Sequence, residues 1–309
     1  MSAGNGTRAI LAALAANAGI AVAKFIGFLV TGSSSMLAES VHSLADTSNQ
    51  GLLLFGKKRA ARAATPEHPF GYGRDRFFYA FVVALLLFTL GAAFSLYEGV
   101  HKIVEPHPVE SPVVAFVILL VALGLESYSF RTAIHESRPL KGDLSWWQFI
   151  RRAVEPELPV VLLEDFGALI GLVLALVGIG LSVLTGDGVW DGIGTVGIGL
   201  LLFAVAAILI VEMKSLLIGE GADAATVRAI TAALEAGRVE RMLHMRTQYL
   251  GPDELLVAAK VALTPGLPVE DVARAIDDAE RRVRSAVPAA RIIYLEPDLD
   301  RTAQDDAVR

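Results

Sequence analysis

The chain has 309 residues, of which 54% are hydrophobic and only 19% are charged, and it contains no cysteine. With a mean hydropathy of +0.53, this composition is typical of a protein that crosses a membrane several times. The absence of cysteine excludes disulfides, thiolate metal sites and cysteine nucleophiles in this chain. The net charge of −6 argues against a nucleic-acid partner, which requires a basic face.

Six segments have about the 20 residues that a helix needs to cross the hydrocarbon core of a bilayer. The second segment is too polar to face lipid on all sides, so we expect the other helices to enclose it. The sequence predicts six transmembrane helices at residues 9–30, 34–55, 77–100, 112–130, 158–184 and 189–211.

Basic residues are concentrated in two of the five connections between these segments. They crowd residues 56–76 and 131–157, whereas residues 31–33 and 185–188 carry none and residues 101–111 carry Lys102 alone. By the positive-inside rule, both termini are expected in the cytoplasm or its equivalent. The N-terminal residues show neither a cleavable signal nor an Arg- and Ser-rich transit peptide. We therefore expect an integral protein of a bacterial cytoplasmic membrane.

The composition changes after residue 213, where soluble secondary structure is predicted. Helices are expected at residues 222–237 and 268–286, and strands at residues 239–249, 255–263 and 291–295. This order predicts a small α+β domain of ferredoxin-like type. The predicted organisation is a transmembrane domain at residues 1–213, a cytoplasmic dimerisation domain at residues 214–300 and a tail at residues 301–309.

Polar residues lie on one face of the second predicted span. Glu39, His42, Asp46 and Asn49 follow one another at spacings of three, four and three residues, so a helix places them in one stripe. Ionisable residues inside a membrane are costly and mark functional sites by default. Imidazole nitrogen and carboxylate oxygen are common ligands of divalent transition metals. The alternative is a polar seam that only joins the helices of a bundle.

Two adjacent acids, Glu164 and Asp165, interrupt the fifth predicted span. Each needs a partner in the membrane, and the stripe on the second span offers one through a shared metal ion. Neighbouring helical residues point about 100° apart, so Asp165 is the stronger candidate ligand and Glu164 reaches the same site only by bending round. The alternative for Glu164 is a hydrogen bond with Asn17, Lys24 or Asn49.

The loop from His68 to Arg74, with the sequence HPFGYGR, is rich in turn-forming residues. Turn geometry is its plain role, and a peripheral metal ligand at His68 is the alternative. No glycine loop of the GK[ST] type follows a strand, which argues against a bound nucleotide. Glu126 is interpreted as a partner between helices rather than as a ligand.

The chain resembles the cation diffusion facilitator family (solute carrier 30) along nearly its whole length. The resemblance rests on the HxxxD pair His42 and Asp46 within LAESVHSLAD, on the HPFGYGR loop, and on Asn17 and Lys24 in the first span. It implies a homodimeric transporter that exchanges a divalent metal cation, most often zinc, for protons. It also implies a metal site between the second and fifth spans, formed by His42, Asp46 and Asp165.

The chain departs from the family pattern in the fifth span. Members usually carry a second HxxxD there, but Val161 stands four residues before Asp165. The Leu-Glu-Asp sequence resembles the branch that includes zinc transporter 9 and makes Glu164 a candidate fourth ligand. In the cytoplasmic domain, the positions of the family's metal ligands correspond to Leu243, Ala259, Tyr294 and Glu296, so no binuclear metal site is expected there.

The predicted function is therefore export of a divalent metal cation from the cytoplasm in exchange for protons, without a cofactor and without enzymatic activity. Zinc is the first choice, and manganese, iron(II) or cobalt suit an oxygen-rich ligand shell. Two alternatives are an intramembrane hydrolase that uses a metal to activate water and a metal-sensing membrane scaffold. An enzyme would bind metal without moving it across a sealed bilayer.

Overall fold

The computed structural model describes residues 3–300, with side chains from residue 17. The chain divides into two compact units, one formed by residues 1–58 and 77–214 and the other by residues 59–76 and 215–309. The loop of residues 59–76 joins the second unit, which the domain prediction did not include. The predicted tail at residues 301–309 lies outside the described residues.

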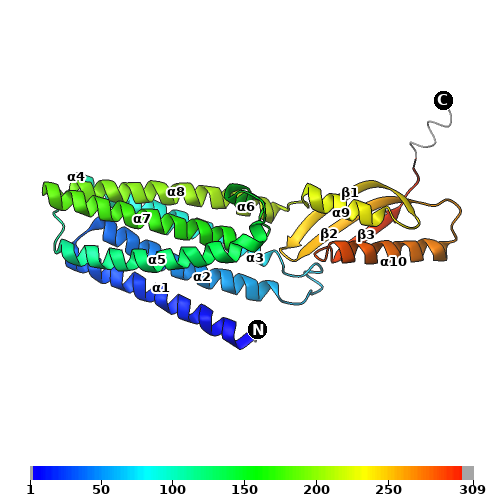
Figure 1. The fold of residues 1–309 in the computed structure, drawn as a ribbon, viewed down its shortest axis with the longest axis horizontal. Coiled ribbons are helices and arrows are strands. Elements are labelled where there is room, and N and C mark those ends of the chain that lie inside the picture. The colour runs from blue at the N-terminus through cyan, green and yellow to red at the C-terminus, as the bar shows by residue number, and fades with distance from the viewer. Residues whose placement is uncertain (1–2, 301–309) are drawn as a thin grey trace, which may run out of the picture. The chain divides into compact units, whose positions relative to one another are not determined.

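The first unit is a bundle of long helices (Figure 1). Helix α5 packs against α7 and against α1. The helices of this unit are α1 (Ala3–Thr31), α2 (Ser34–Ala60), α3 (Asp75–Leu86), the π-helix η1 (Leu87–Ala93), α4 (Phe94–Val104), α5 (Pro112–Lys141), α6 (Trp146–Arg152), α7 (Glu157–Thr185) and α8 (Val189–Ile218).

Four of these helical stretches are long and apolar enough to cross a membrane. They are Asp75–Val104, which contains α3, η1 and α4, together with Pro112–Lys141, Glu157–Thr185 and Val189–Ile218. The third to sixth predicted spans are thus confirmed as apolar helices of sufficient length, although α5 and α8 continue well beyond the predicted ends. The described apolar part of α1, Asn17–Thr31, is shorter, and α2 is too polar to qualify by composition. Six spans therefore stay a prediction.

Small residues allow α7 and α8 to approach each other closely. A Cβ atom added at Gly178 would lie 3.0 Å from the carbonyl oxygen of Trp190, and one added at Gly194 would lie 3.0 Å from that of Leu174. The buried face of α7 also includes Gly171 and Ala175. Close backbone packing through small residues is a common way to join helices in a membrane, and here it holds one face of α7 against α8.

The second unit contains a three-stranded sheet in the order β1–β2–β3. Strand β1 (Val239–Gly251) is antiparallel to β2 (Glu254–Leu263), and β2 is parallel to β3 (Ile292–Pro297). Helices α9 (Ala224–Leu234) and α10 (Val269–Ala286) pack against this sheet (Figure 1). Its core is formed by residues including Ile230, Leu234, Val257, Val261, Ala279 and Val283. The predicted small α+β domain is confirmed, with each element displaced by at most three residues.

Candidate functional site

Helix α2 is anchored at its first turn by a carboxylate from another helix. Asp191 of α8 is fully buried and accepts hydrogen bonds from the hydroxyl of Ser33 at 2.9 Å, from the backbone N–H of Ser34 at 2.8 Å and from that of Ser35 at 3.3 Å. Lys102 of α4 donates to the carbonyl oxygen of Gly32 at 3.0 Å. A carboxylate at this position satisfies the free N–H groups of a helix start and complements the helix dipole. Asp191 thereby fixes the end of the helix that carries the polar stripe.

We predict that Asp191→Ala destabilises the protein by about 1–3 kcal/mol, because two buried backbone N–H groups lose their acceptor. The measurement is the unfolding midpoint of the purified chain in detergent. Asp191→Asn serves as the matched variant, since its amide oxygen can still accept from the first turn of α2. An Asp191→Ala protein as stable as the wild type would contradict the anchoring role.

The stripe on α2 faces the interior of the bundle. Glu39, His42 and Asn49 are fully or almost fully buried, and the side chain of Asp46 is 14% exposed. Large residues on the opposite side, Leu44 and Phe55 among them, are exposed and apolar. Helix α2 therefore presents its ionisable groups to other helices and its apolar groups outward.

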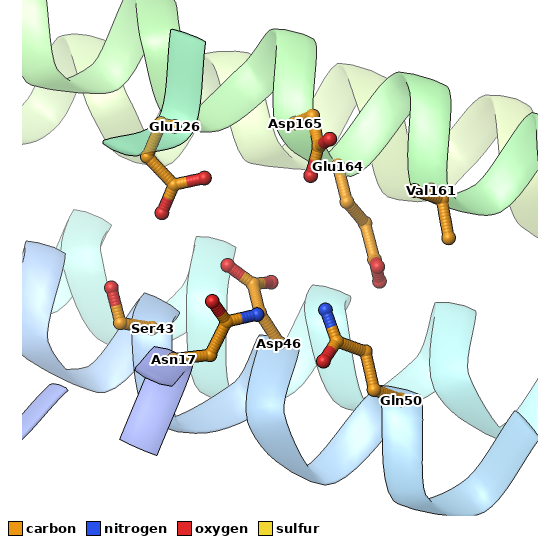
Figure 2. A pocket seen from close by; sticks show the side chains of 8 residues that line it. All are labelled: Asn17, Ser43, Asp46, Gln50, Glu126, Val161, Glu164 and Asp165. Carbon is orange, nitrogen blue, oxygen red and sulfur yellow. The ribbon is translucent and has the colours of Figure 1, made fainter. Parts of the chain in front are cut away.

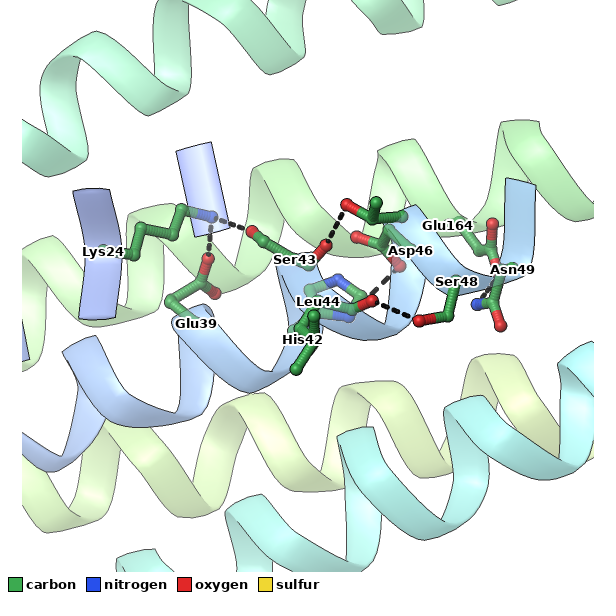
Figure 3. Close-up of polar contacts among 10 residues, drawn as sticks. Lys24, Glu39, His42, Ser43, Leu44, Asp46, Ser48, Asn49 and Glu164 are labelled. Atoms are coloured by element: carbon green, nitrogen blue, oxygen red, sulfur yellow. Dashed lines mark hydrogen bonds and ion pairs between the residues drawn. The ribbon is translucent and has the colours of Figure 1, made fainter. Parts of the chain in front are cut away.

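A buried ion pair joins α1 to this stripe (Figure 3). The ammonium group of Lys24 lies 2.9 Å from Glu39 Oε2 and donates to the hydroxyl of Ser43 at 2.8 Å. Both charged side chains are 0% exposed. The second carboxylate oxygen of Glu39 has no hydrogen-bond partner among the described residues. Lys24 thus supplies the counter-charge of Glu39.

Four carboxylates surround a small cavity in the same unit (Figure 2). Asp46 comes from α2, Glu126 from α5, and Glu164 and Asp165 from α7, and their side chains point toward one another. The cavity volume is about 10 Å³, which suffices for roughly one water molecule or one ion. The remaining lining residues are Asn17, Ser43, Gln50 and Val161.

Neutral donors hold two of these carboxylates in place. The amide of Asn49 donates to Glu164 Oε1 at 2.7 Å, and the hydroxyl of Ser129 donates to Asp165 Oδ2 at 2.9 Å. In contrast, Asp46 Oδ1 has no hydrogen-bond partner among the described residues. Each of these donors satisfies one carboxylate oxygen without supplying a counter-charge.

Three of the four predicted ligands, Asp46, Glu164 and Asp165, line this cavity, whereas His42 lies beside it. The distance from His42 Nδ1 to Asp46 Oδ1 is 3.5 Å, and neither ring nitrogen has a hydrogen-bond partner among the described residues. Within the described part of the chain, no group of three or more His, Asp or Glu side chains is arranged to hold a metal ion. The ligand set therefore stays a prediction.

Both acids of α7 reach the same cavity, and one of the hydrogen-bond partners considered for Glu164 is present. Asp165 and Glu164 both line the cavity, although they are neighbours on one helix. Of the three partners considered for Glu164, Asn49 binds it, while Lys24 binds Glu39 instead. Val161, which stands where the family pattern has a histidine, also lines the cavity.

Glu126 is the lining residue that sequence reasoning undervalued. It was interpreted as a partner between helices, but its carboxylate faces the cavity (Figure 2). The signal was available, because Glu126 interrupts an apolar span just as Glu164 and Asp165 do. Asn17 had a similar signal, as a polar residue in the first apolar span, whereas the lining positions of Ser43 and Gln50 had none.

The sheet of the second unit has a shallow pocket at the predicted family positions. Tyr294, Ala259 and Glu296 line it together with His244. Glu296 lies 3.0 Å from Lys260, and hydrogen bonds to Glu296 and Asp298 raise the pKa of the Lys260 ammonium group. The only carboxylate among the four family ligand positions, Glu296, is thus paired with the Lys260 ammonium group. The expectation that no binuclear metal site forms here stays a prediction.

Comparison with known proteins gives one family. Residues 10–218 match the model of the cation efflux transmembrane domain. The proton-coupled zinc antiporter SLC30A9, mitochondrial, is 36% identical over 77% of this chain in Xenopus laevis and 34% identical over 77% of it in Homo sapiens. Metal tolerance protein C4 of Arabidopsis thaliana is 28% identical over 82% of this chain. The chain spans only 43%, 42% and 56% of the lengths of these three relatives.

The family match covers the membrane unit, including the α2 stripe and the acids of α5 and α7. Together with the four apolar helices, it makes this chain an integral membrane protein. Proteins of this family are transporters rather than enzymes, which removes the hydrolase alternative. The chain belongs to the cation efflux, or cation diffusion facilitator, family, in the branch that includes zinc transporter 9.

Proposed function

We propose that this protein moves a divalent metal cation, with zinc as the first candidate, across a membrane in exchange for protons. The observation that carries the proposal is the buried cavity surrounded by Asp46, Glu126, Glu164 and Asp165 (Figure 2). Four acids around a space of this size are costly unless a cation or protons neutralise them. The negative charge of the carboxylates can be neutralised either by one bound metal ion or by several protons.

The proposed metal ligands are His42, Asp46 and Asp165, with Glu164 or water completing the shell. The ring nitrogens of His42 and Oδ1 of Asp46 have no hydrogen-bond partner among the described residues. These atoms support the set, because buried polar atoms without hydrogen bonds need another partner. Small movements of α2 against α7 would bring the imidazole to the acids. A shell of one imidazole and several carboxylates also suits manganese, iron(II) or cobalt.

Exchange follows from the chemistry of the ligands. A carboxylate or an imidazole must lose its proton before it coordinates a metal ion, so loading the site releases protons. Protons that arrive from the opposite side compete with the metal and release it. The transmembrane proton gradient is then sufficient to drive the cycle.

The membrane arrangement belongs to the same proposal. We infer that α1 and α2 also cross the bilayer, because α2 turns its polar residues inward and exposes Leu44 and Phe55. Both termini then lie on the side with the basic loops, and the direction of transport is out of the cytoplasm. We further propose that the second unit supports a homodimer in a bacterial cytoplasmic membrane.

The test is counter-transport in sealed proteoliposomes that contain the full chain. We expect zinc to enter the vesicles only when an outward proton gradient is imposed, and the gradient to collapse faster when zinc is added. A panel of manganese, iron(II) and cobalt in the same assay identifies the preferred ion. Metal binding without any metal flux would contradict transport, and flux that is indifferent to the proton gradient would contradict exchange.

A further inference from the structure

The loop between α2 and α3 forms a cavity with the sheet of the second unit. The cavity volume is about 640 Å³, and its walls combine the loop with β1 and β2 through Gln248, Leu250 and Leu256. Residues 59–76, which comprise the loop and the adjoining ends of α2 and α3, contribute three arginines, two carboxylates and three rings: Arg59, Arg62, Arg74, Glu67, Asp75, His68, Phe70 and Tyr72. The cavity lies entirely within one compact unit.

Only some of the arginine side chains that line this cavity form ion pairs with other described side chains. Arg59 lies 2.9 Å from Asp75 and is bound to it. Arg62 and Arg74 are exposed, and neither guanidinium group has a hydrogen-bond or ion-pair partner among the described residues. Apart from Asp75, the only acid among the described lining residues is Glu67. Each guanidinium group is planar and carries several N–H donors, a geometry that suits phosphate oxygens, and two such groups without side-chain partners among the described residues line one cavity.

The loop holds these side chains in a defined geometry. The backbones of Thr65 and His68 exchange two hydrogen bonds at 3.0 and 3.2 Å, and the rings of His68 and Tyr72 stack with centroids 4.6 Å apart. Gly73 packs so tightly on β1 that an added Cβ atom would lie 2.5 Å from the carbonyl oxygen of Leu250. A loop fixed in this way loses little conformational freedom when it binds a ligand.

We propose that this cavity binds a phosphate-bearing ligand through Arg62 and Arg74, with the Phe70 and Tyr72 rings against the rest of the molecule. The same chemistry is offered by free phosphate and by the head group of an anionic phospholipid. The loop starts where α2 ends and finishes where α3 begins, so a bound anion would restrain the connection between them. The proposal does not depend on metal transport.

The first arm of the test uses inorganic phosphate. The purified full chain is titrated with sodium phosphate at constant ionic strength in a calorimeter, for the wild type and for Arg62→Gln/Arg74→Gln. We expect the double variant to bind at least about tenfold more weakly, since hydrogen bonds to charged groups contribute most to such affinity. Arg228→Gln/Arg291→Gln, which removes two exposed arginines of the same unit outside this cavity, is the matched control and should bind as the wild type does.

The second arm measures how many phosphatidylglycerol and phosphatidylcholine molecules the same three proteins retain in native mass spectrometry. Arginine-dependent retention of phosphatidylglycerol, without phosphate binding, identifies the lipid head group as the ligand. Arginine-dependent phosphate binding identifies a free phosphate compound. If neither ligand depends on Arg62 and Arg74, or if the control variant loses as much binding, the proposed site is wrong.

Discussion

Replacing Lys24 by methionine is expected to destabilise the membrane unit by roughly 3–5 kcal/mol, because it leaves the buried carboxylate of Glu39 without its counter-charge. Both side chains are 0% exposed, and their charged atoms lie 2.9 Å apart. One oxygen of Glu39 already lacks a hydrogen-bond partner among the described residues. The loss of Lys24 would therefore leave the whole carboxylate dependent on protonation. The measurement is the unfolding midpoint of the detergent-solubilised protein at neutral pH.

Two variants separate loss of the ion pair from loss of packing. Lys24→Met/Glu39→Met removes both charges, and replacing a buried ion pair by apolar residues is often neutral or stabilising, so the double variant should regain most of the lost stability. Lys214→Met changes an exposed lysine of α8 and should have no effect. If Lys24→Met and Lys214→Met are equally stable, the ion pair does not hold α1 to α2. If the double variant is no better than Lys24→Met, packing rather than charge is responsible.

The elements of the second unit could be predicted almost residue by residue. Strand β2 is an almost uniformly apolar run interrupted only by Lys260, and it follows the turn-forming sequence Leu-Gly-Pro-Asp at residues 250–253. A short apolar run bounded by turn residues predicts a strand. Asp223 caps α9 through the N–H groups of Ala225 and Thr226, as an N-cap residue does. Local patterns determine these elements, so a sequence is sufficient to find them.

Two local features of the membrane unit were missed for different reasons. Helix α6 carries a recognisable signal, because Ser145 and Gln148 form a capping box, but its seven residues were absorbed into a basic loop. The π-helix Leu87–Ala93 interrupts an otherwise uniform apolar run, and its sequence contains no residue that marks the change. Gly91 within it packs against Leu202 of α8. The distortion is a property of helix packing rather than of the local sequence.

The site could be predicted as a set of residues but not as a set of contacts. Periodicity alone placed Asp46 on the inner face of α2, and the cost of buried acids singled out Asp165. Which partner each group takes depends on the rotation of one helix against another. Thus Lys24 binds Glu39, fifteen positions away, rather than Glu164, and Glu126, for which only a contact between helices is predicted, lines the cavity.

The largest functional effect is expected at the cavity itself. Asp165→Asn should reduce zinc-dependent proton flux in proteoliposomes by roughly 100-fold or more, since even residues that only support metal ligands cost 10–100-fold when replaced. The asparagine keeps the size of the side chain and can still accept from Ser129, which donates to Asp165 at 2.9 Å. Folding should therefore survive while the charge that attracts the cation is lost.

Matched variants decide which groups form the ion-binding shell. On α5, Glu126→Gln alters a residue that lines the cavity, whereas Glu136→Gln makes the same change at an exposed position, so only the first should slow the flux. His42→Ala is the sharper test, because His42 lies beside the cavity, with Nδ1 3.5 Å from Asp46 Oδ1. If His42→Ala abolishes flux as Asp165→Asn does, the imidazole joins the acids during transport. Full activity in His42→Ala combined with loss in Asp165→Asn would restrict the shell to carboxylates, and full activity in both would overturn the site.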